Sequence, residues 1–306
     1  MRHFRLLEDV FIEGAWLTIG SFDGVHRGHQ EIVKQLTAGA HQQGAPAVVL
    51  TFYPHPIAVL RGANGPFYLT SPEERAKMLG ELGVDIVITL PFTRELAATP
   101  AREFIAELRQ HIKFHSLWVG YDFTLGKGRE GNVTMLQQFG DEFGYDLKVL
   151  RPVIAGEEPI SSTRIRSALA SGDVTHTAEW LGRSYSVFGQ VITGEGRGRS
   201  IGIPTANLDI WPEKILPAFG VYACRATVGN QTFKAATNLG VRPTFKGNTA
   251  PSVEAHLLDF SGDLYGQVIQ LEFITRLRGE QKFTNIQALI EQIHRDIADT
   301  STIVRL

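Results

Sequence analysis

Two histidines three residues apart, His26 and His29, follow a short apolar stretch and lie among the glycines of residues 20–29. At this spacing both imidazoles can share one face of the first turn of a helix. Gly24 and Gly28 let backbone approach a phosphate closely, and the N–H groups at a helix N-terminus attract anions. The segment predicts a site where both histidines hydrogen-bond a phosphate that gains charge during a reaction. The pattern alone is weak, and zinc binding is disfavoured because neither a nearby cysteine nor an HExxH sequence is present.

A second cluster of anion-binding groups occupies residues 160–166. Ser162 and Thr163 provide hydroxyls, and Arg164 and Arg166 follow them with guanidinium groups that suit phosphate oxygens. A capped helix with a solvated basic face explains the serine and threonine equally well. Together with the histidine segment, this cluster could grip a nucleoside triphosphate from both ends.

The second half of the chain contains another glycine-rich stretch, whose glycines fit neither the P-loop nor the Rossmann spacing: Gly194, Gly196, Gly198 and Gly202. A flexible hairpin is the alternative explanation. The residues that follow are more specific, because Thr205 and Asn207 lie two apart on an extended segment and so face the same side. Such neutral oxygens bind Mg²⁺ when ATP phosphates complete the coordination shell, which suits a kinase.

A kinase that phosphorylates a hydroxyl also needs a base. Glu254, next to apolar Val253 at the start of an expected strand, is our candidate. Surface carboxylates are common, so its position alone is weak support.

These segments need a scaffold, and the composition predicts two ordinary globular domains. The chain has 306 residues, 43% of them hydrophobic and 20% charged, which is about twice a typical domain. A net charge of -2 argues against binding a long polyanion, so we expect small ligands and no nucleic acid. Cys224 is the only cysteine, and neither an apolar leader in residues 1–14 nor a run long enough to span a membrane is evident. We expect a cytoplasmic protein without a membrane partner.

Short apolar runs alternate with amphipathic stretches through the first half, which predicts a parallel sheet covered by helices on both faces. The sequence around Ser71 and Glu74 is typical of a capping box, and Thr99 with Pro100 is expected to open a helix in the same way. The expected strands are residues 16–19, 47–52, 85–90, 117–119 and 146–150.

After two further expected helices, at residues 162–170 and 175–181, the pattern changes to strands joined by turns. Gly229 and Asn230 are typical of a two-residue hairpin. We predict a small antiparallel β-barrel closed by a helix at about residues 285–298. The predicted domains are residues 1–182 and 183–306, and the expected strands of the second are residues 185–191, 222–228, 232–236, 253–259 and 268–273.

The first half resembles the HxGH nucleotidyltransferase superfamily, and the run Ile160 to Arg166 stands where related synthetases carry a KMSKS loop. This combination is typical of FMN adenylyltransferases. The resemblance implies a Rossmann-like α/β domain in which His26 and His29 contact ATP phosphates. It also implies that Arg166 is catalytic and binds the departing β and γ phosphates together with Ser162 and Thr163. The residues that it assigns to ATP binding in the first loop are Gly20, Phe22, Asp23 and Gly28.

Two further runs of the first half are similar to flavin-side loops of the same family. Residues 51–56 imply that His55 and Pro56 bind flavin, although a packed loop histidine explains His55 equally well. Residues 119–126 imply the same role for Asp122 and Phe123.

The second half resembles riboflavin kinases in several runs that occur in order, from residue 189 to residue 283. The resemblance implies that Thr205 and Asn207 hold Mg²⁺ with ATP and that Glu254 deprotonates the riboflavin 5′-hydroxyl. It further implies that residues 194–202 and Pro204 bind ATP and that Arg278 lies in a flavin-side flap.

The order of the two resemblances is that of the bacterial bifunctional riboflavin kinase/FMN adenylyltransferase family. Riboflavin, FMN and ATP would be the substrates, both steps would need Mg²⁺, and FMN and FAD would be substrate or product rather than prosthetic groups. The alternatives are an enzyme with one activity only and a flavin-sensing or flavin-storage module without catalysis. A class I synthetase is disfavoured because a KMSKS-like run and a basic charge are both lacking. The sequence leaves open whether the protein is a monomer or a transient homo-oligomer.

Overall fold

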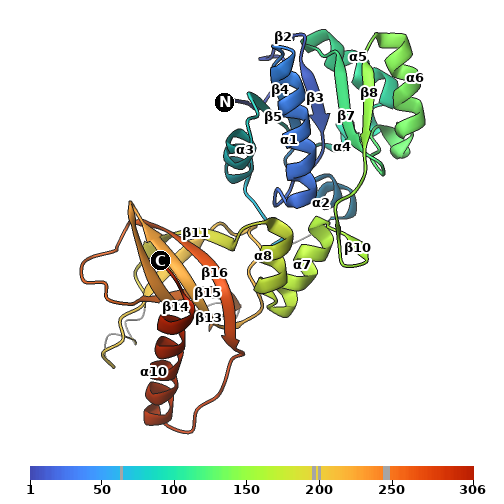
Figure 1. The fold of residues 1–306 in the computed structure, drawn as a ribbon. Helices are drawn as coiled ribbons and strands as arrows, with labels where there is room; N and C mark the ends of the chain where they lie inside the picture. The colour runs from blue at the N-terminus through green and yellow to red at the C-terminus, as the bar shows by residue number, and fades with distance from the viewer. Residues whose placement is uncertain (63–64, 195–197, 199–200, 244–248) are drawn as a thin grey trace. The chain divides into compact units, whose positions relative to one another are not determined.

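A computed structural model describes residues 1–62, 65–194, 198, 201–243 and 249–306. The chain divides into two compact units, Met1–Ser162 and Thr163–Leu306 (Figure 1). Gly196, one of the glycines with a predicted ATP-binding role, lies outside the described residues.

The first unit is built on a six-stranded sheet whose order is β1-β5-β4-β3-β7-β8, and every neighbouring pair is parallel. This confirms the predicted α/β class. The expected strands agree with the observed ones to within one residue at each end. The bounds are β1 Arg2–Phe4, β3 Trp16–Ile19, β4 Ala47–Phe52, β5 Ile86–Leu90, β7 Ser116–Gly120 and β8 Asp146–Leu150, with the short pairs β2 Ile12–Glu13 and β6 Ile112–Lys113, and β9 Ile154–Ala155 and β10 Glu158–Pro159.

Helices cover the two faces of this sheet, because alternate residues of the strands are apolar on opposite sides. On one face Val49 and Val87 pack with residues of α1 and α3, and on the other Leu50 and Ile88 pack with residues of α5 and α6. The helices of this unit are α1 Arg27–Gln42, α2 Pro56–Arg61, α3 Pro72–Glu81, α4 Arg94–Ala98, α5 Ala101–His111, the 3₁₀ turn η1 Lys127–Arg129 and α6 Val133–Phe143.

Local sequence explains the start of α3 but not that of α5. Ser71 and Glu74 form the expected capping box. A helix does begin after Thr99 and Pro100, but the predicted side-chain cap was wrong. The N-cap residue of α5 is Pro100, and no side-chain hydrogen bond from this residue caps the helix. The N–H of Ala101 instead donates to the carboxylate of Glu130 at 2.8 Å, so a residue distant in the sequence satisfies this helix end.

The second unit contains a closed antiparallel barrel with the strand order β11-β12-β15-β14-β13-β16. This confirms the predicted barrel, the Gly229–Asn230 hairpin and the closing helix, while β12 is a strand that the apolar pattern missed. The elements are α7 Ser162–Ser171, α8 Val174–Leu181, β11 Tyr185–Ile192, β12 Ala206–Ile210, β13 Gly220–Val228, β14 Gln231–Pro243, β15 Thr249–Leu257, β16 Val268–Arg278 and α10 Ile286–Ile303.

The two helices before the barrel, α7 and α8, pack against it. Arg276 of β16 donates hydrogen bonds to the main-chain oxygens of Ser171, at the end of α7, and of Phe219. The division by contacts therefore follows Ser162, whereas the sequence pattern predicts a boundary after residue 182. The predicted boundary stays a prediction.

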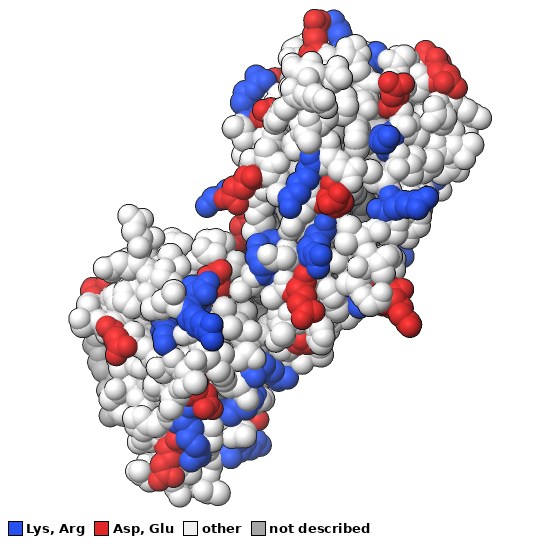
Figure 2. All heavy atoms as spheres, in the orientation of Figure 1, with Lys and Arg blue, Asp and Glu red and all other residues white. Residues whose placement is uncertain are grey.

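Charges of both signs are mixed on the face of the molecule drawn in Figure 2, where Lys and Arg side chains lie among Asp and Glu side chains. Strong non-specific binding of nucleic acid needs many cations that neutralise phosphates together. The visible face therefore offers little support for a polyanion partner.

Candidate functional sites

The histidine segment lies at the topological switch point of the parallel sheet. From β3 the chain adds β4 and then β5 on one side, and it later returns to place β7 on the other side of β3. Open α/β sheets bind ligands at such a point, outside the carboxyl ends of the strands. The segments that follow β3, β4 and β7 contain residues 20–29, 53–56 and 121–126, so sheet order alone brings the three predicted loops to one edge.

The two histidines of this segment stack on each other at the start of α1. Their ring centroids are 3.7 Å apart and their planes differ by 19°. His26 is the N-cap, and its Nδ1 accepts a hydrogen bond from the N–H of His29 at 3.3 Å. Gly28 leaves room for the His26 ring in this position, since a Cβ at residue 28 would lie 3.0 Å from Cε1 of His26.

The imidazole of His29 is held neutral. Desolvation lowers its pKa well below the usual 6.5, and the neighbouring His26, Arg75 and His55 lower it further. Among the described residues, no group hydrogen-bonds the buried Nδ1 of His29. A neutral ring with an unsatisfied nitrogen suits hydrogen bonding to an anionic ligand at the helix N-terminus.

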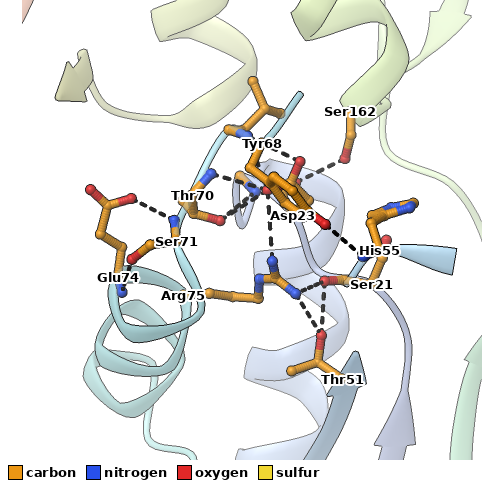
Figure 3. Close-up of polar contacts among 12 residues, drawn as sticks. Ser21, Asp23, Thr51, His55, Tyr68, Thr70, Ser71, Glu74, Arg75 and Ser162 are labelled. Carbon is orange, nitrogen blue, oxygen red and sulfur yellow. Dashed lines mark hydrogen bonds and ion pairs between the residues drawn. The ribbon is translucent and has the colours of Figure 1, made fainter. Parts of the chain in front are cut away.

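The loop between β3 and α1 contains two buried residues with predicted ATP-binding roles, Phe22 and Asp23, which are 2% and 0% exposed. The ring of Phe22 covers Gly20, where a Cβ would lie 3.0 Å from Cε2 of the phenylalanine. The main-chain oxygen of Asp23 accepts a hydrogen bond from the Ser162 hydroxyl at 2.8 Å (Figure 3). The structure thus brings together two of the predicted phosphate-binding elements, the first loop and Ser162.

The predicted flavin-side residues occupy the neighbouring loops. His55 is 5% exposed and caps α2, with its Nδ1 accepting from the N–H of Ile57 at 3.1 Å, and Pro56 is the first residue of that helix. Asp122 is exposed in the turn after β7, whereas Phe123 packs partly against the core. His55 thus has a structural role as the cap of α2, and its contact with flavin stays a prediction.

In the barrel unit, three polar residues form a row across adjacent strands. Asn207 of β12 is the cross-strand partner of Glu254 of β15, which is in turn the partner of Asn238 of β14. Directly opposed residues project from the same face with Cβ atoms about 4.5–5.5 Å apart. The buried Val253 and Ala255 point into the barrel, so the row lies on its outer face. The predicted base and one predicted Mg²⁺ ligand are therefore side by side.

Two described glycines of the glycine-rich stretch, Gly194 and Gly198, lie close to the two predicted Mg²⁺ ligands. A Cβ on Gly194 would be 2.0 Å from Nδ2 of Asn207, and a Cβ on Gly198 would be 3.3 Å from Oγ1 of Thr205. Asn207 is 7% exposed, and its Oδ1 is buried without a hydrogen-bond partner in the described part of the chain. An unsatisfied buried oxygen beside a hydroxyl fits a hard cation that carries ATP phosphates as further ligands.

A cavity of about 320 Å³ begins beside Pro204 and Thr205. Its walls include Val191 and Leu257, and the loop from Phe260 to Tyr265 forms its far side. A cavity of this size admits part of a small ligand. The resemblance to riboflavin kinases covers this part of the chain, but the sequence did not predict that the loop lies next to Thr205, because the contact joins segments distant in the chain.

Comparisons with known proteins agree with this layout. The model of the FAD synthetase family matches residues 10–164, and the model of the riboflavin kinase family matches residues 181–304. The bifunctional riboflavin kinase/FMN adenylyltransferase of Escherichia coli strain K12 is 38% identical over 93% of this chain and 91% of its own length. That of Listeria monocytogenes is 35% identical over 93% and 90%.

The chain belongs to the bifunctional riboflavin kinase/FMN adenylyltransferase family. A solved structure described as a macrolide-efflux protein from Streptococcus pneumoniae shares the fold over 98% of both chains, with a TM-score of 0.88 and 29% identity. Its name concerns that protein, whereas both family models and the curated relatives agree on flavin nucleotide synthesis.

The predicted roles of Thr163, Arg166 and Arg278 stay predictions, like those of the other site residues. Thr163 and Arg166 lie in the part of α7 that belongs to the second unit, and their contact with phosphates stays a prediction. Arg278, predicted to bind flavin, forms an ion pair with Asp296 of α10 at 2.8 Å. This pair ties the end of β16 to α10, and a role toward flavin stays a prediction.

Proposed function

We propose that the barrel unit transfers a phosphoryl group from ATP to the 5′-hydroxyl of riboflavin, giving FMN and ADP. The first unit then adenylylates FMN with a second ATP, giving FAD and pyrophosphate. The observation that carries the proposal is the presence of a separate polar site in each unit of a chain that matches its bifunctional relatives over nearly their whole length.

In the kinase step Glu254 accepts the proton of the riboflavin hydroxyl as that oxygen forms its bond to the γ-phosphorus and ADP leaves. Thr205 and Asn207 hold Mg²⁺, which when bound neutralises charge on the ATP phosphates. The position of Glu254 directly opposite Asn207 supports this pairing of base and metal ligand. The cavity beside Thr205 takes the nucleoside part of ATP.

In the adenylylation step an oxygen of the FMN phosphate attacks the α-phosphorus of ATP, and pyrophosphate leaves without a covalent enzyme intermediate. The chain therefore contributes positioning and charge stabilisation. His26 and His29 hydrogen-bond the phosphates at the N-terminus of α1, while Ser162, Thr163 and Arg166 bind the departing pyrophosphate. The stacked pair, with a neutral His29, supports the first assignment.

We place both steps in the cytoplasm. The only cysteine, Cys224, is a buried free thiol, which is compatible with a reducing compartment. No helix in the described ranges has the length and apolar character that crossing a membrane requires. We further propose a monomer, or at most a transient homo-oligomer, since each unit holds its own candidate site.

Incubation of the protein with riboflavin, ATP and Mg²⁺ tests the proposal. Chromatography should show FMN appearing first and FAD later, with ADP and pyrophosphate as the other products. Chelation of Mg²⁺ by EDTA should stop both conversions, because the ATP phosphates then lose the cation that neutralises them. Stoichiometric flavin binding without turnover would instead indicate a storage or sensing module, and accumulation of FMN alone would indicate a single activity.

Substitution of Gly194 by alanine should impair only the kinase step. The new Cβ would overlap Nδ2 of Asn207 at 2.0 Å and push the predicted Mg²⁺ ligand from its place. A displacement of about 1 Å in a catalytic group costs on the order of 100-fold in rate, so we expect a loss of that size in FMN formation. FAD formation from supplied FMN, measured on the same preparation, should not change.

A matched control for this variant is Gly229→Asn at the hairpin between β13 and β14. Gly229 has a φ of +56° and no atom within 4 Å of an added Cβ, and asparagine tolerates this conformation. Normal kinase activity in Gly194→Ala would show that Asn207 does not need its present position.

A further inference from the structure

The side chain of Arg75 is completely buried in the first unit, which is rare for an arginine. It comes from the first turns of α3 and points toward the loop after β3 (Figure 3). Its Nη1 donates to the main-chain oxygens of Ser21 at 2.7 Å and Phe52 at 3.1 Å, and to Oγ1 of Thr51 at 2.9 Å. One side chain thus joins the start of the loop to the carboxyl end of β4.

The charge of Arg75 is compensated by Asp23, whose Oδ1 lies 4.0 Å from Nη2, and both side chains are 0% exposed. The carboxylate of Asp23 also accepts hydrogen bonds from the N–H groups of Leu69 and Thr70, at 3.1 Å and 3.0 Å, and from the Thr70 hydroxyl at 3.1 Å. Buried charges are tolerated only when they are paired and hydrogen-bonded. The carboxylate therefore points into the protein and holds the segment before α3.

The main chain of the same loop contacts Ser162, one of the predicted phosphate-binding residues, and is also tied to Thr70. The oxygen of Asp23 accepts from Ser162, and the N–H of Gly24 donates to the Thr70 hydroxyl at 3.1 Å. The loop then runs directly into the stacked His26 and His29. The buried pair of Arg75 and Asp23 thus holds the loop that leads into His26 and His29.

We propose that Arg75 is a positioning residue for adenylyl transfer: paired with Asp23, it fixes the loop that carries His26 and His29 against the end of β4. The inference rests on the proposed function, because it assumes that the histidines act on ATP. In this proposal Asp23 supports the loop rather than binding ATP directly, since its carboxylate faces Arg75 and accepts hydrogen bonds from main-chain N–H groups. The cation of Arg75 additionally contributes to the low pKa of His29.

Arg75→Lys is the most informative variant, because it retains the positive charge but has only one ammonium group in place of Nη1, which donates to three acceptors, and Nη2, which faces Asp23. We expect kcat for FAD formation from supplied FMN to fall about 10- to 100-fold, as for other small displacements of catalytic groups. Riboflavin phosphorylation by the same preparation should stay within about twofold of wild type, since its site lies in the other unit. Arg109→Lys is the matched control, because Arg109 is a half-buried arginine of the same unit that also donates to a main-chain oxygen, that of Phe114.

A pH profile separates positioning from simple loss of stability. Arg75→Met removes the cation, so the inflection due to His29, which His26 and His55 also face, should move to higher pH than in Arg75→Lys. Where the methionine or lysine variant fails to fold, Thr51→Val removes one acceptor of Arg75 together with the hydrogen bond that the Thr51 hydroxyl donates to the main-chain oxygen of Ser21. We expect about a 3- to 10-fold lower kcat for FAD formation. All rates are measured well below the unfolding temperature of each variant.

The outcomes distinguish this inference from the proposed function. A wild-type protein that makes no FAD contradicts the proposed function itself. A wild-type protein that makes FAD, with Arg75→Lys or Thr51→Val folded and equally fast, overturns only the role of Arg75. A lowered kcat for adenylyl transfer with unchanged kinase activity, and an unaffected Arg109→Lys control, supports it.

Discussion

Substitution of Glu254 by glutamine will greatly slow riboflavin phosphorylation and leave FMN adenylylation intact. Glutamine keeps the size of the side chain and one acceptor oxygen but cannot accept the proton of the attacking hydroxyl. A positioned general base contributes about 10²- to 10⁴-fold to a rate, and we expect kcat for FMN formation to fall by that amount. The binding of ATP should change little, because the proposed Mg²⁺ ligands Thr205 and Asn207 are untouched.

The measurement follows FMN from riboflavin and, separately, FAD from supplied FMN. Glu272→Gln is a suitable control: Glu272 also lies on a barrel strand and is partly exposed, but it pairs with Arg225 at 3.3 Å. Loss of such a pair costs about 1 kcal/mol at most, so both activities should survive. If Glu254→Gln retains more than about a tenth of the kinase rate, the carboxylate is not the base. If it stays folded and loses both activities, the two sites are not independent.

Sequence patterns were sufficient to predict most helices and strands and to find the segments that contain the candidate site residues. The central strands Ala47–Phe52 and Ile86–Leu90 are largely apolar because a sheet covered on both faces buries them, and Ala47–Phe52 is found as predicted. The capping box at Ser71 and Glu74 is local in the chain, so its residues alone predict it. The strand β12 was missed because its five residues follow a glycine-rich stretch and contain polar Asn207.

Contacts between distant segments could not be predicted from local pattern. Arg75 reads as an ordinary charged residue of an amphipathic helix, and only the fold shows that it is buried against Asp23. The helix α5 receives its cap from Glu130 for the same reason. The row formed by Asn207 and Glu254 depends on the register of β12 and β15, which the sequence does not specify without the barrel. The candidate site residues thus lie in short segments that the sequence identifies, whereas the contacts that hold them in place join segments distant in the chain.

Substitution of His29 by alanine will have the opposite effect to Glu254→Gln. FAD formation from supplied FMN should fall about 10²- to 10³-fold, as expected when one preorganised hydrogen-bond donor to a developing charge is removed. FMN formation from riboflavin should continue at the wild-type rate. His41→Ala is the matched control, since His41 lies on the same helix, α1, and pairs with Asp85 on the surface. Equal loss in both histidine variants would point to damage to α1 rather than to catalysis.

The protonation state of His29 provides an independent check on this variant. Its pKa in the folded protein is well below 6.5, chiefly through desolvation. Below about pH 6.5 the unfolded chain therefore binds a proton at this residue that the folded chain does not, and folding stability falls as the pH decreases. His29→Ala lacks this difference, so its thermal unfolding temperature should decrease less than that of wild type between about pH 7 and about pH 5. An identical pH dependence in the two proteins would mean that the ring is solvated. It would contradict the proposal that a neutral, desolvated His29 binds the ATP phosphates.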